Sequence, residues 1–304
     1  MADLRPGSYL YLVNAGSNDV DVLDAGSLGL IRTIPVGQVP SDIVVSPLGR
    51  RAFVISPTDS AVTVIDTRTA QTVGNPIEVV PHPSGAVASA DGRTLFVASA
   101  ETDDVRAYDV GTGRRHWSPI KVGKAPGDLA LSPDGRRLYV TSEDQNEVRT
   151  IDVATWSVFG DPIQVGPSPT GIAVSRAGDR LFVSSSYSDS ISVIDTQSGA
   201  VVRQREFVGS NPTSIVVSPN GQRLYVANQK SGTVSVVNPV SLQEIAVIGT
   251  GKAPSAVTIS EDGRAVYVAN MFSNSVTVID SSGPHVASQA NIGSSPRGIA
   301  LEVL

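Results

Sequence analysis

The sequence of 304 residues contains no cysteine, two methionines, two tryptophans and three histidines. Without cysteine, the chain has no disulfide, no thiolate metal site and no cysteine nucleophile. Charged residues are also scarce, at 17% of the sequence, and the net charge is −6. We therefore expect neither nucleic acid nor an anionic membrane as a partner, because both bind positively charged surfaces. No apolar run approaches the roughly 20 residues of a membrane-spanning helix.

Sequence motifs of common catalytic centres are also missing. There is no Gly-x-Ser-x-Gly elbow, no His-Glu-x-x-His and no glycine-rich phosphate loop that opens a helix. The first residues, Met1 to Pro6, lack the apolar stretch of a secretory signal peptide. As written, the sequence predicts a cytoplasmic protein, and a periplasmic or secreted one if a leader was removed.

Internal repetition is the most informative feature that the sequence has. Three markers keep one register through seven copies: a proline after a Gly-x-x segment, an aromatic residue in one apolar run, and an Asp or Asn at the end of another. The prolines, 42 or 43 residues apart, are Pro40, Pro83, Pro126, Pro169, Pro212, Pro254 and Pro296. The aromatic residues are Tyr11, Phe53, Phe96, Tyr139, Phe182, Tyr225 and Tyr267. The Asp and Asn residues are Asp24, Asp66, Asp109, Asp152, Asp195, Asn238 and Asp280.

One repeat, Ile172–Val208, shows what each unit forms. Short apolar runs at Ile172–Ser175, Arg180–Ser184 and Ile191–Asp195 are separated by turn residues, and a fourth run ends at Val208. Four antiparallel strands at a period of about 43 residues are typical of a β-propeller blade. The first strands are apolar on both faces, which is expected when each blade lies between two neighbours. The sequence therefore predicts an all-β, seven-bladed propeller.

The two ends of the chain complete this prediction. Tyr9–Val13 stands in the place of a second strand, and Ile299–Leu301 stands in the place of a first strand. We expect residues 296–304 to pair with 9–36 and complete one blade, so that residues 1–304 form a single closed domain, which we expect to be a monomer. Pro76, Pro119 and Pro162 fall within predicted fourth strands, at the outer edge of the blades, where a missing N–H is tolerated.

Tyr225-Val226-Ala227-Asn228, Tyr267-Val268-Ala269-Asn270 and Tyr139-Val140-Thr141-Ser142 resemble the signature of the YVTN-repeat propeller family. Ser132-Pro133-Asp134-Gly135 is similar to that family's turn between the first and second strands. The resemblance covers essentially the whole chain and implies the same seven-bladed fold. The family includes bacterial periplasmic and archaeal surface-layer proteins and is distantly similar to streptogramin B lyase-type propellers, so the resemblance implies a fold but no single activity.

The strand order places two kinds of loop on opposite faces of the ring. The Asp-Gly turns and the turns after the seven Asx residues repeat almost unchanged on one face, and we expect the Asx side chains to bind their own turn backbone. On the other, variable face lie the Gly-x-x-Pro segments and the loops after the second strands. Propeller ligands usually bind over the channel at such a mouth, where we place any site.

Four polar residues at this mouth are candidates for catalysis. His82 replaces the usual residue in Val80-Pro81-His82-Pro83, and imidazole transfers protons near neutral pH. Asp42, Asp128 and Arg297 follow three of the repeat prolines, where the other blades carry small residues. Asp42 and Arg297 are also candidates for a simple ion pair. His116 and His285 fall in outer strands, where we expect surface positions.

Two further groups of residues at the mouth are candidates for binding. Tyr187, Met271 and Phe272 place apolar side chains in otherwise polar loops, and Lys124 and Lys252 add positive charge. Glu101, Asp103, Glu143 and Asp144 form either a solvated acidic rim or a Mg²⁺ or Ca²⁺ site. Nothing else in the sequence calls for a cofactor.

The sequence leaves two functions open. One is a propeller that binds or scaffolds a small molecule, peptide or protein at the variable face. The alternative is a propeller enzyme, a lyase, hydrolase or cyclase, with a polar site at the channel mouth.

Overall fold

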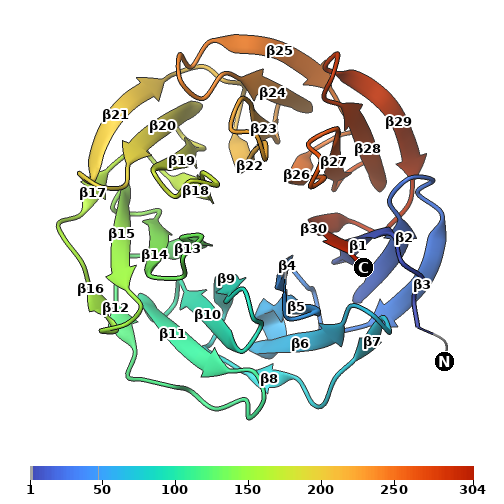
Figure 1. The fold of residues 1–304 in the computed structure, drawn as a ribbon, viewed down its shortest axis with the longest axis horizontal. Coiled ribbons are helices and arrows are strands. Elements are labelled where there is room, and N and C mark those ends of the chain that lie inside the picture. Colours follow the sequence, from blue (N-terminus) through green and yellow to red (C-terminus); the bar gives the residue numbers. More distant parts are fainter. Residues whose placement is uncertain (1–2, 47) are drawn as a thin grey trace.

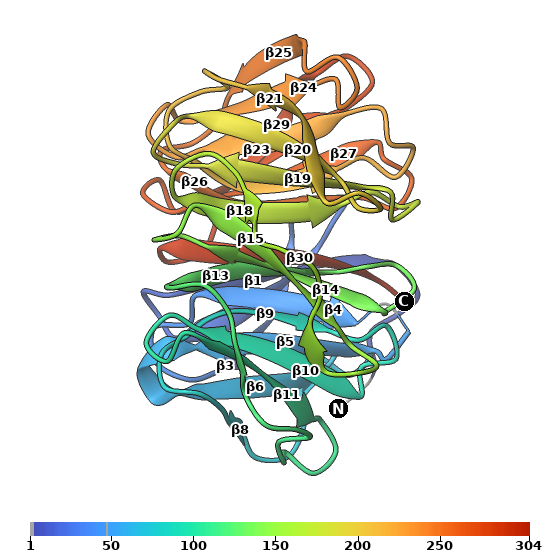
Figure 2. The ribbon, with the colours of Figure 1, turned by 90° about the vertical axis from the view of Figure 1, so that its left-hand side faces the viewer.

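The computed structural model describes residues 3–46 and 48–304 and confirms the predicted seven-bladed propeller. Seven antiparallel sheets surround a central channel (Figure 1). The strands cross the thickness of the ring, and the loops that join them lie on its two faces (Figure 2). None of the helices among the described residues is long and apolar enough to cross a lipid bilayer.

Each sheet is one blade, and the blades are numbered around the ring. Within a blade the chain runs from the inner strand, at the channel, to the outer strand at the rim (Figure 1). The blades are blade 1 (β30, β1, β2 and β3), blade 2 (β4–β8), blade 3 (β9–β12), blade 4 (β13–β17), blade 5 (β18–β21), blade 6 (β22–β25) and blade 7 (β26–β29).

The first and second strands of the blades are regular and mostly buried. The first strands are β4 (Asp42–Ser46), β9 (Pro83–Ala88), β13 (Pro126–Leu131), β18 (Pro169–Val174), β22 (Pro212–Val217), β26 (Pro254–Ile259) and β30 (Pro296–Val303). The second strands are β5 (Arg51–Ser56), β10 (Thr94–Ser99), β14 (Arg137–Ser142), β19 (Arg180–Ser185), β23 (Leu224–Asn228), β27 (Ala265–Asn270) and β1 (Ser8–Asn14).

The third strands are equally regular, whereas the fourth strands differ between blades. The third strands are β6 (Ala61–Asp66), β11 (Asp104–Asp109), β15 (Glu147–Asp152), β20 (Ser190–Asp195), β24 (Thr233–Val237), β28 (Ser275–Asp280) and β2 (Asp19–Asp24). The fourth strands are β7 (Gln71–Thr72) with β8 (Ile77–Glu78), β12 (Ile120–Lys121), β16 (Ser157–Val158) with β17 (Ile163–Gln164), β21 (Ala200–Arg205), β25 (Glu244–Gly249), β29 (His285–Asn291) and β3 (Leu30–Pro35). A short 3-10 helix, η1 (Pro57–Asp59), follows β5.

The position of three outer prolines corrects one detail of the prediction. Pro76 lies between β7 and β8, Pro162 lies between β16 and β17, and Pro119 precedes β12. They therefore stand in interruptions of the fourth strand and not within it. A proline has no N–H to donate to the third strand, so the ladder breaks where it stands.

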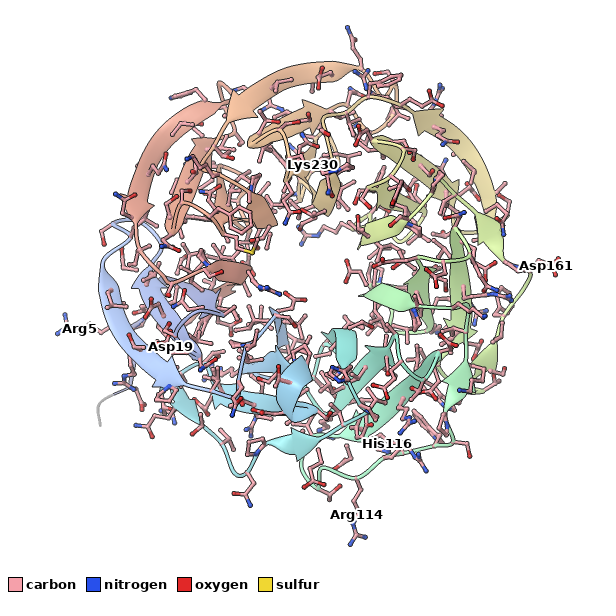
Figure 3. All side chains as sticks on the ribbon, turned by 180° about the vertical axis from the view of Figure 1, so that it is seen from behind. Arg5, Asp19, Arg114, His116, Asp161 and Lys230 are labelled. Carbon is pink, nitrogen blue, oxygen red and sulfur yellow. The ribbon has the colours of Figure 1, made fainter. Side chains whose placement is uncertain are left out.

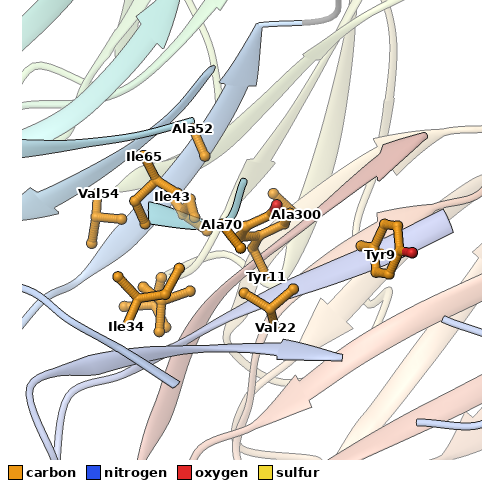
Figure 4. Packing of buried hydrophobic residues seen from close by; sticks show 12 residues of the cluster. Tyr9, Tyr11, Val22, Ile34, Ile43, Ala52, Val54, Ile65, Ala70 and Ala300 are labelled. Carbon is orange, nitrogen blue, oxygen red and sulfur yellow. The ribbon is translucent and has the colours of Figure 1, made fainter. Parts of the chain in front are cut away.

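The hydrophobic core lies between blades and not within them. Seven clusters of buried side chains each combine residues from two neighbouring blades. Figure 4 shows the cluster of blades 1 and 2, in which Tyr11 and Val22 of blade 1 face Val54 and Ile65 of blade 2. The predicted core aromatic residues are all buried, with exposed fractions of at most 5%. Their role in packing between blades is thus confirmed.

The seven Asx residues at the ends of third strands act as predicted. In each, Oδ1 accepts a hydrogen bond of 2.7–2.9 Å from a backbone N–H two or three residues further on. The Thr155 backbone N–H and then the Arg137 guanidinium lower the pKa of Asp152 to about 2. These carboxylates are occupied by their own turns and are not free to bind a ligand.

Ring closure joins the two ends of the chain in blade 1. Strand β30 pairs antiparallel with β1, from Ser8 opposite Val303 to Asn14 opposite Pro296. Ile299 and Ala300 of β30 are buried, each with 6% of its surface exposed. The predicted pairing of residues 296–304 with the N-terminal strands is therefore confirmed.

This closure gives a test by mutation. Replacing Ile299 by Ala should lower the free energy of unfolding by about 2–5 kcal/mol, because it leaves a cavity between blades 1 and 7. Val303→Ala is the matched control, since Val303 is 47% exposed in the same strand. Urea denaturation followed by circular dichroism measures both variants. A chain truncated after residue 295 should melt far below the full chain, and melting within a few degrees of it would contradict closure by β30.

Candidate functional site

The variable face is built on a repeated contact between two of the sequence markers. The glycine of each Gly-x-x-Pro segment lies against the last residue of a second strand. A Cβ atom on Gly251 would lie 2.7 Å from the Cβ of Asn270, and one on Gly37 would lie 2.8 Å from the Cβ of Ser56. The glycines therefore allow this close approach, and the loops above it are held in a fixed position.

The residue before each repeat proline has a left-handed backbone, with φ between 44° and 56°. In five blade junctions its N–H donates to an Asp or Asn side chain of the preceding blade. The pairs are Val39 with Asn18, Ala125 with Asp103, Ser168 with Asn146, Asn211 with Asp189, and Ser295 with Asn274. Asp103, predicted as a metal ligand, thus holds a loop in place.

His82 occupies one of these left-handed positions, with φ of 44°. Its side chain is 67% exposed, and Nε2 lies 3.9 Å from the carboxylate of Glu101, itself 55% exposed. An exposed pair at this distance contributes little to stability. His82 therefore points toward Glu101 in the neighbouring loop, which holds the one carboxylate among the described residues within 4.0 Å of the imidazole ring. Its catalytic role stays a prediction.

Asp42 and Asp128 lie on the inner strands β4 and β13, each two residues after a repeat proline. Blade 3 separates them, and there the same position is Gly85 of β9. Asp128 joins two blades: Oδ1 accepts from Leu129 N at 2.8 Å, and Oδ2 accepts from Ile172 N of blade 5 at 3.1 Å. Asp42 Oδ1 accepts from Ile43 N at 2.8 Å. Among the described residues, no hydrogen bond reaches Asp42 Oδ2.

Both carboxyl groups hold their proton more tightly than an exposed aspartic acid. Both side chains are only partly exposed. Burial raises the pKa of Asp42 from 3.8 to about 6. Burial, and then the negative charge of Asp42, raises the pKa of Asp128 to about 7. The pair therefore titrates near neutral pH, which is the range that proton transfer requires.

The predicted ion pair between Asp42 and Arg297 is wrong. In residues 3–46 and 48–304, no ion pair within 4.0 Å involves Arg297, and its side chain is exposed. Arg297 instead stands at a position where four other blades make a hydrogen bond to the next blade. At the same position, Ser84, Thr170, Thr213 and Ser255 each donate a hydroxyl hydrogen bond to the proline carbonyl of the next blade. Arginine has no hydroxyl, and its side chain extends to the solvent.

The residues of the predicted acidic rim have separate surroundings in the described part of the chain. Across the part of the chain that the structure describes, no three Asp, Glu or His side chains converge as metal ligands. Burial, and then the negative charge of Asp144, raises the pKa of Glu143. Glu101 faces His82, and Asp103 holds the Ala125 backbone. The geometry therefore favours the solvated rim over the Mg²⁺ or Ca²⁺ site.

A groove on the variable face brings together two of the predicted binding residues. This mouth groove lies between blades 6 and 7, has a volume of about 720 Å³, and is lined by 229–232, 250–253 and 272–273. Phe272 is 72% exposed, and Lys230 and Lys252 are also exposed. No described carboxylate lies within 4.0 Å of either lysine. Figure 3 shows Lys230 on the inner part of the ring, whereas Arg5, Arg114 and Asp161 extend from the rim.

The other predicted binding residues lie apart from this groove. Lys124 precedes β13, three blades away from Lys252, and Tyr187 follows β19 in blade 5, where it is 86% exposed. Met271 is part of the same loop as Phe272 but does not line the groove. Lys230 was not identified from the sequence as a binding residue. Its only signal in the sequence is a lysine between the polar residues Gln229 and Ser231, which is typical of any surface loop.

The protein is thus a seven-bladed β-propeller that has two aspartates on its inner strands and a groove with lysine and phenylalanine side chains on its variable face. Residues 75–241, more than half of the chain, match the family described as lactonase, 7-bladed β-propeller, and the chain belongs to this family. Residues 217–299 also match the YNCE-like β-propeller family. The likeness to YVTN repeats in particular stays a prediction.

Solved structures share this fold. A functionally unknown protein from Desulfotomaculum acetoxidans is 17% identical, with a TM-score of 0.83 over 97% of this chain and 99% of that chain. Hydrazine synthase from Kuenenia stuttgartiensis is 23% identical, with a TM-score of 0.58 over 80% of this chain and 96% of that chain. Both likenesses show the fold alone. No curated protein matches the chain.

The channel carboxyl groups predict how stability depends on pH. The pKa of Asp42 is about 6 in the folded chain and near 3.8 when exposed, so the folded state binds the proton more tightly. Its contribution to stability is complete below about pH 4 and is lost as the pH rises through about 6. Asp42→Asn keeps an oxygen for Ile43 N and removes the charge. It should raise the free energy of unfolding by about 1–3 kcal/mol at pH 8 and by much less at pH 4.

Urea denaturation of wild type and Asp42→Asn at the two pH values measures this difference. Asp161→Asn, at the exposed outer rim (Figure 3), is the control and should show no such change with pH. An equal effect of Asp42→Asn at both pH values would show that Asp42 is not held protonated in the channel.

Proposed function

We propose that this propeller binds a small anionic molecule with a flat apolar part in the mouth groove. The observation that carries the proposal is the pairing of two exposed lysines that have no carboxylate partner with the exposed ring of Phe272, all within one groove. Small-molecule sites are typically concave and combine apolar or aromatic side chains with a few polar groups, as this groove does. The groove's volume of about 720 Å³ lies within the 300–1,000 Å³ range of small-molecule sites.

The backbone of the groove supports binding because it is rigid. Phe272 N donates to Lys252 O at 3.1 Å, and Lys230 N donates to Ser210 O at 3.1 Å. Lys252 N donates to the Ser273 hydroxyl at 3.0 Å. These hydrogen bonds fix the segments before β22 and β26 against the loops that follow β23 and β27, and Thr250 N donates to Gly232 O at 2.9 Å, so the groove is largely formed before a ligand arrives. A preformed site loses less conformational entropy on binding.

Phenyl phosphate, which combines a ring with a dianion, is a suitable probe. Phe272→Ala, Lys252→Ser and Lys230→Ser should each weaken its binding about three- to tenfold, measured by isothermal titration calorimetry. Serine stands at the position of Lys252 in other blades, at Ser210 and Ser294, so this substitution suits the loop. Lys124→Ser, three blades away, is the control. Equal affinity of Phe272→Ala, Lys252→Ser and wild type would place the ligand elsewhere.

A second candidate function is the hydrolysis of a lactone inside the channel. The family's description as lactonases supports it, and so does the Asp42–Asp128 pair. We propose that the Asp42 carboxylate accepts a proton from water as the water oxygen bonds to the lactone carbonyl carbon. The ring C–O bond then breaks, the ring oxygen takes up the proton, and a hydroxy acid leaves. A pKa of about 6 suits a general base at neutral pH.

Dihydrocoumarin, an aromatic lactone, tests this second function by its absorbance change on ring opening. Asp42→Asn should lower kcat by about 10²–10⁴-fold. His82→Ala is the control and should leave the rate unchanged, since alanine occupies the equivalent left-handed positions at Ala125 and Ala253. No hydrolysis above the buffer rate by the wild type, or an Asp42→Asn variant as fast as the wild type, would contradict a lactonase activity on this substrate.

A further inference from the structure

The face of the ring that carries the tight turns lies opposite the mouth groove. On this face, several pairs of neighbouring blades have a cleft between them. The cleft between blades 3 and 4 has a volume of about 210 Å³, the one between blades 4 and 5 about 420 Å³, and the one between blades 5 and 6 about 800 Å³. Because the blades repeat, an equivalent aromatic residue of the second strand lines each of these three clefts: Phe96 of β10, Tyr139 of β14 and Phe182 of β19. Their volumes differ because different side chains enter them.

Aromatic side chains of the protein fill the two smaller clefts. Between blades 3 and 4, Trp117 stacks on Trp156 with ring centroids 4.9 Å apart, and Trp156 in turn stacks on Phe96 at 5.9 Å. Between blades 4 and 5, the guanidinium of Arg137 lies over the ring of Phe159, 3.9 Å from its centroid. The chain itself thus shows which chemical group these clefts accept: a flat aromatic ring against an arginine or another ring.

In the cleft between blades 5 and 6 this ring is missing. Phe159 follows Asp152 by seven residues, and Val202 follows Asp195 by the same number. Arg180, which pairs with Asp195 as Arg137 pairs with Asp152, has no ring above it. Its side chain is accordingly 39% exposed, against 30% for Arg137. Val202, at 48% exposed, covers less of the apolar floor than phenylalanine does in blade 4.

The open cleft, called here the turn-face cleft, also departs from the repeat at its edge. Arg176 stands where the equivalent turns have Pro133 and Pro219, and Val240, 72% exposed, lies in the turn after β24. Asp179, the one carboxylate in its lining, accepts a hydrogen bond from the Ser175 hydroxyl at 2.7 Å and so closes its own turn.

Two arginines of the turn-face cleft have no acidic partner. Within residues 3–46 and 48–304, no carboxylate lies within 4.0 Å of Arg176 or of Arg203. Both side chains are exposed. The cleft between blades 2 and 3 has a similar volume, about 770 Å³, but its lining has two basic and two acidic side chains and no large apolar side chain that is exposed. An excess of positive charge beside an apolar floor is thus particular to the turn-face cleft.

We propose that the turn-face cleft is a second ligand site, which binds a small aromatic carboxylate. The ring of the ligand takes the place of the missing phenylalanine, over Arg180 and against Phe182 and Val202. Its carboxylate is held by Arg176 and Arg203, whose guanidinium groups can donate two parallel hydrogen bonds. This site lies on the face opposite the mouth groove and does not depend on the function proposed there.

The decisive variant restores the side chain that the repeat has in the neighbouring blade. Val202→Phe should fill the cleft and weaken binding of 1-naphthoate at least about tenfold, measured by calorimetry, since the ligand's ring and the new side chain occupy the same space. The double variant Arg176→Ala/Arg203→Gln should also bind 1-naphthoate about tenfold more weakly than the wild type does. The neutral analogue 1-naphthalenemethanol should lose far less affinity in this double variant, because it has no carboxylate for the arginines.

Two controls separate this site from others. Phe159→Val makes the reverse exchange in the cleft of blades 4 and 5 and should leave the tight naphthoate site unchanged. Phe272→Ala changes only the mouth groove, so it should leave the naphthoate affinity of the turn-face cleft unchanged, and any naphthoate bound at the mouth should be lost as a separate binding event. If Phe272→Ala abolishes naphthoate binding and Val202→Phe does not, the ligand binds at the mouth and the turn-face site is excluded. Failure of wild type to bind naphthoate at millimolar concentration would likewise overturn it.

Discussion

Packing between neighbouring blades is the interaction on which every other feature of this protein depends. Each apolar cluster combines side chains of two neighbouring blades, so no blade has a core of its own. A single four-stranded sheet would expose both apolar faces and would not be stable. The channel carboxyl groups and both grooves exist because loops and strand ends from two blades are held against each other by these clusters.

The repeat explains why the fold was predictable. Seven copies of the same proline, aromatic and Asx markers predict a ring that buries the seven marker aromatic residues, and the structure has this arrangement. The outer strands were less predictable. Pro76, Pro119 and Pro162 indicate that the fourth strand lies at the edge of its blade. The sequence does not show whether the hydrogen bonds to the third strand continue past each proline or end there.

The candidate site was predictable only in part. Asp42, Asp128 and Phe272 differ from the residues at the same position in other blades, and this difference marked them in the sequence. The sequence did not predict which side chains lie beside them. Arg297 extends to solvent instead of pairing with Asp42, and Lys230 of blade 6 lines the same groove as Phe272 of blade 7. The turn-face cleft was not predictable from the sequence, because it arises from the absence of an aromatic ring at Val202. That absence is informative only after the structure shows the equivalent residue, Phe159, packed against Arg137.

The pairing of β30 with β1 sets the order in which the chain acquires its structure during synthesis. Strand β1 is made before the other strands of the ring, yet its inner edge finds a partner only when residues 296–303 follow. At about 5–20 residues per second, roughly 15–60 s separate the two events. For that time Leu10 and Leu12, fully buried in the ring, lie on an unpaired strand edge. An unpaired strand edge favours pairing with other chains, and closure of the ring has to wait for a contact between two strands that are far apart in the sequence.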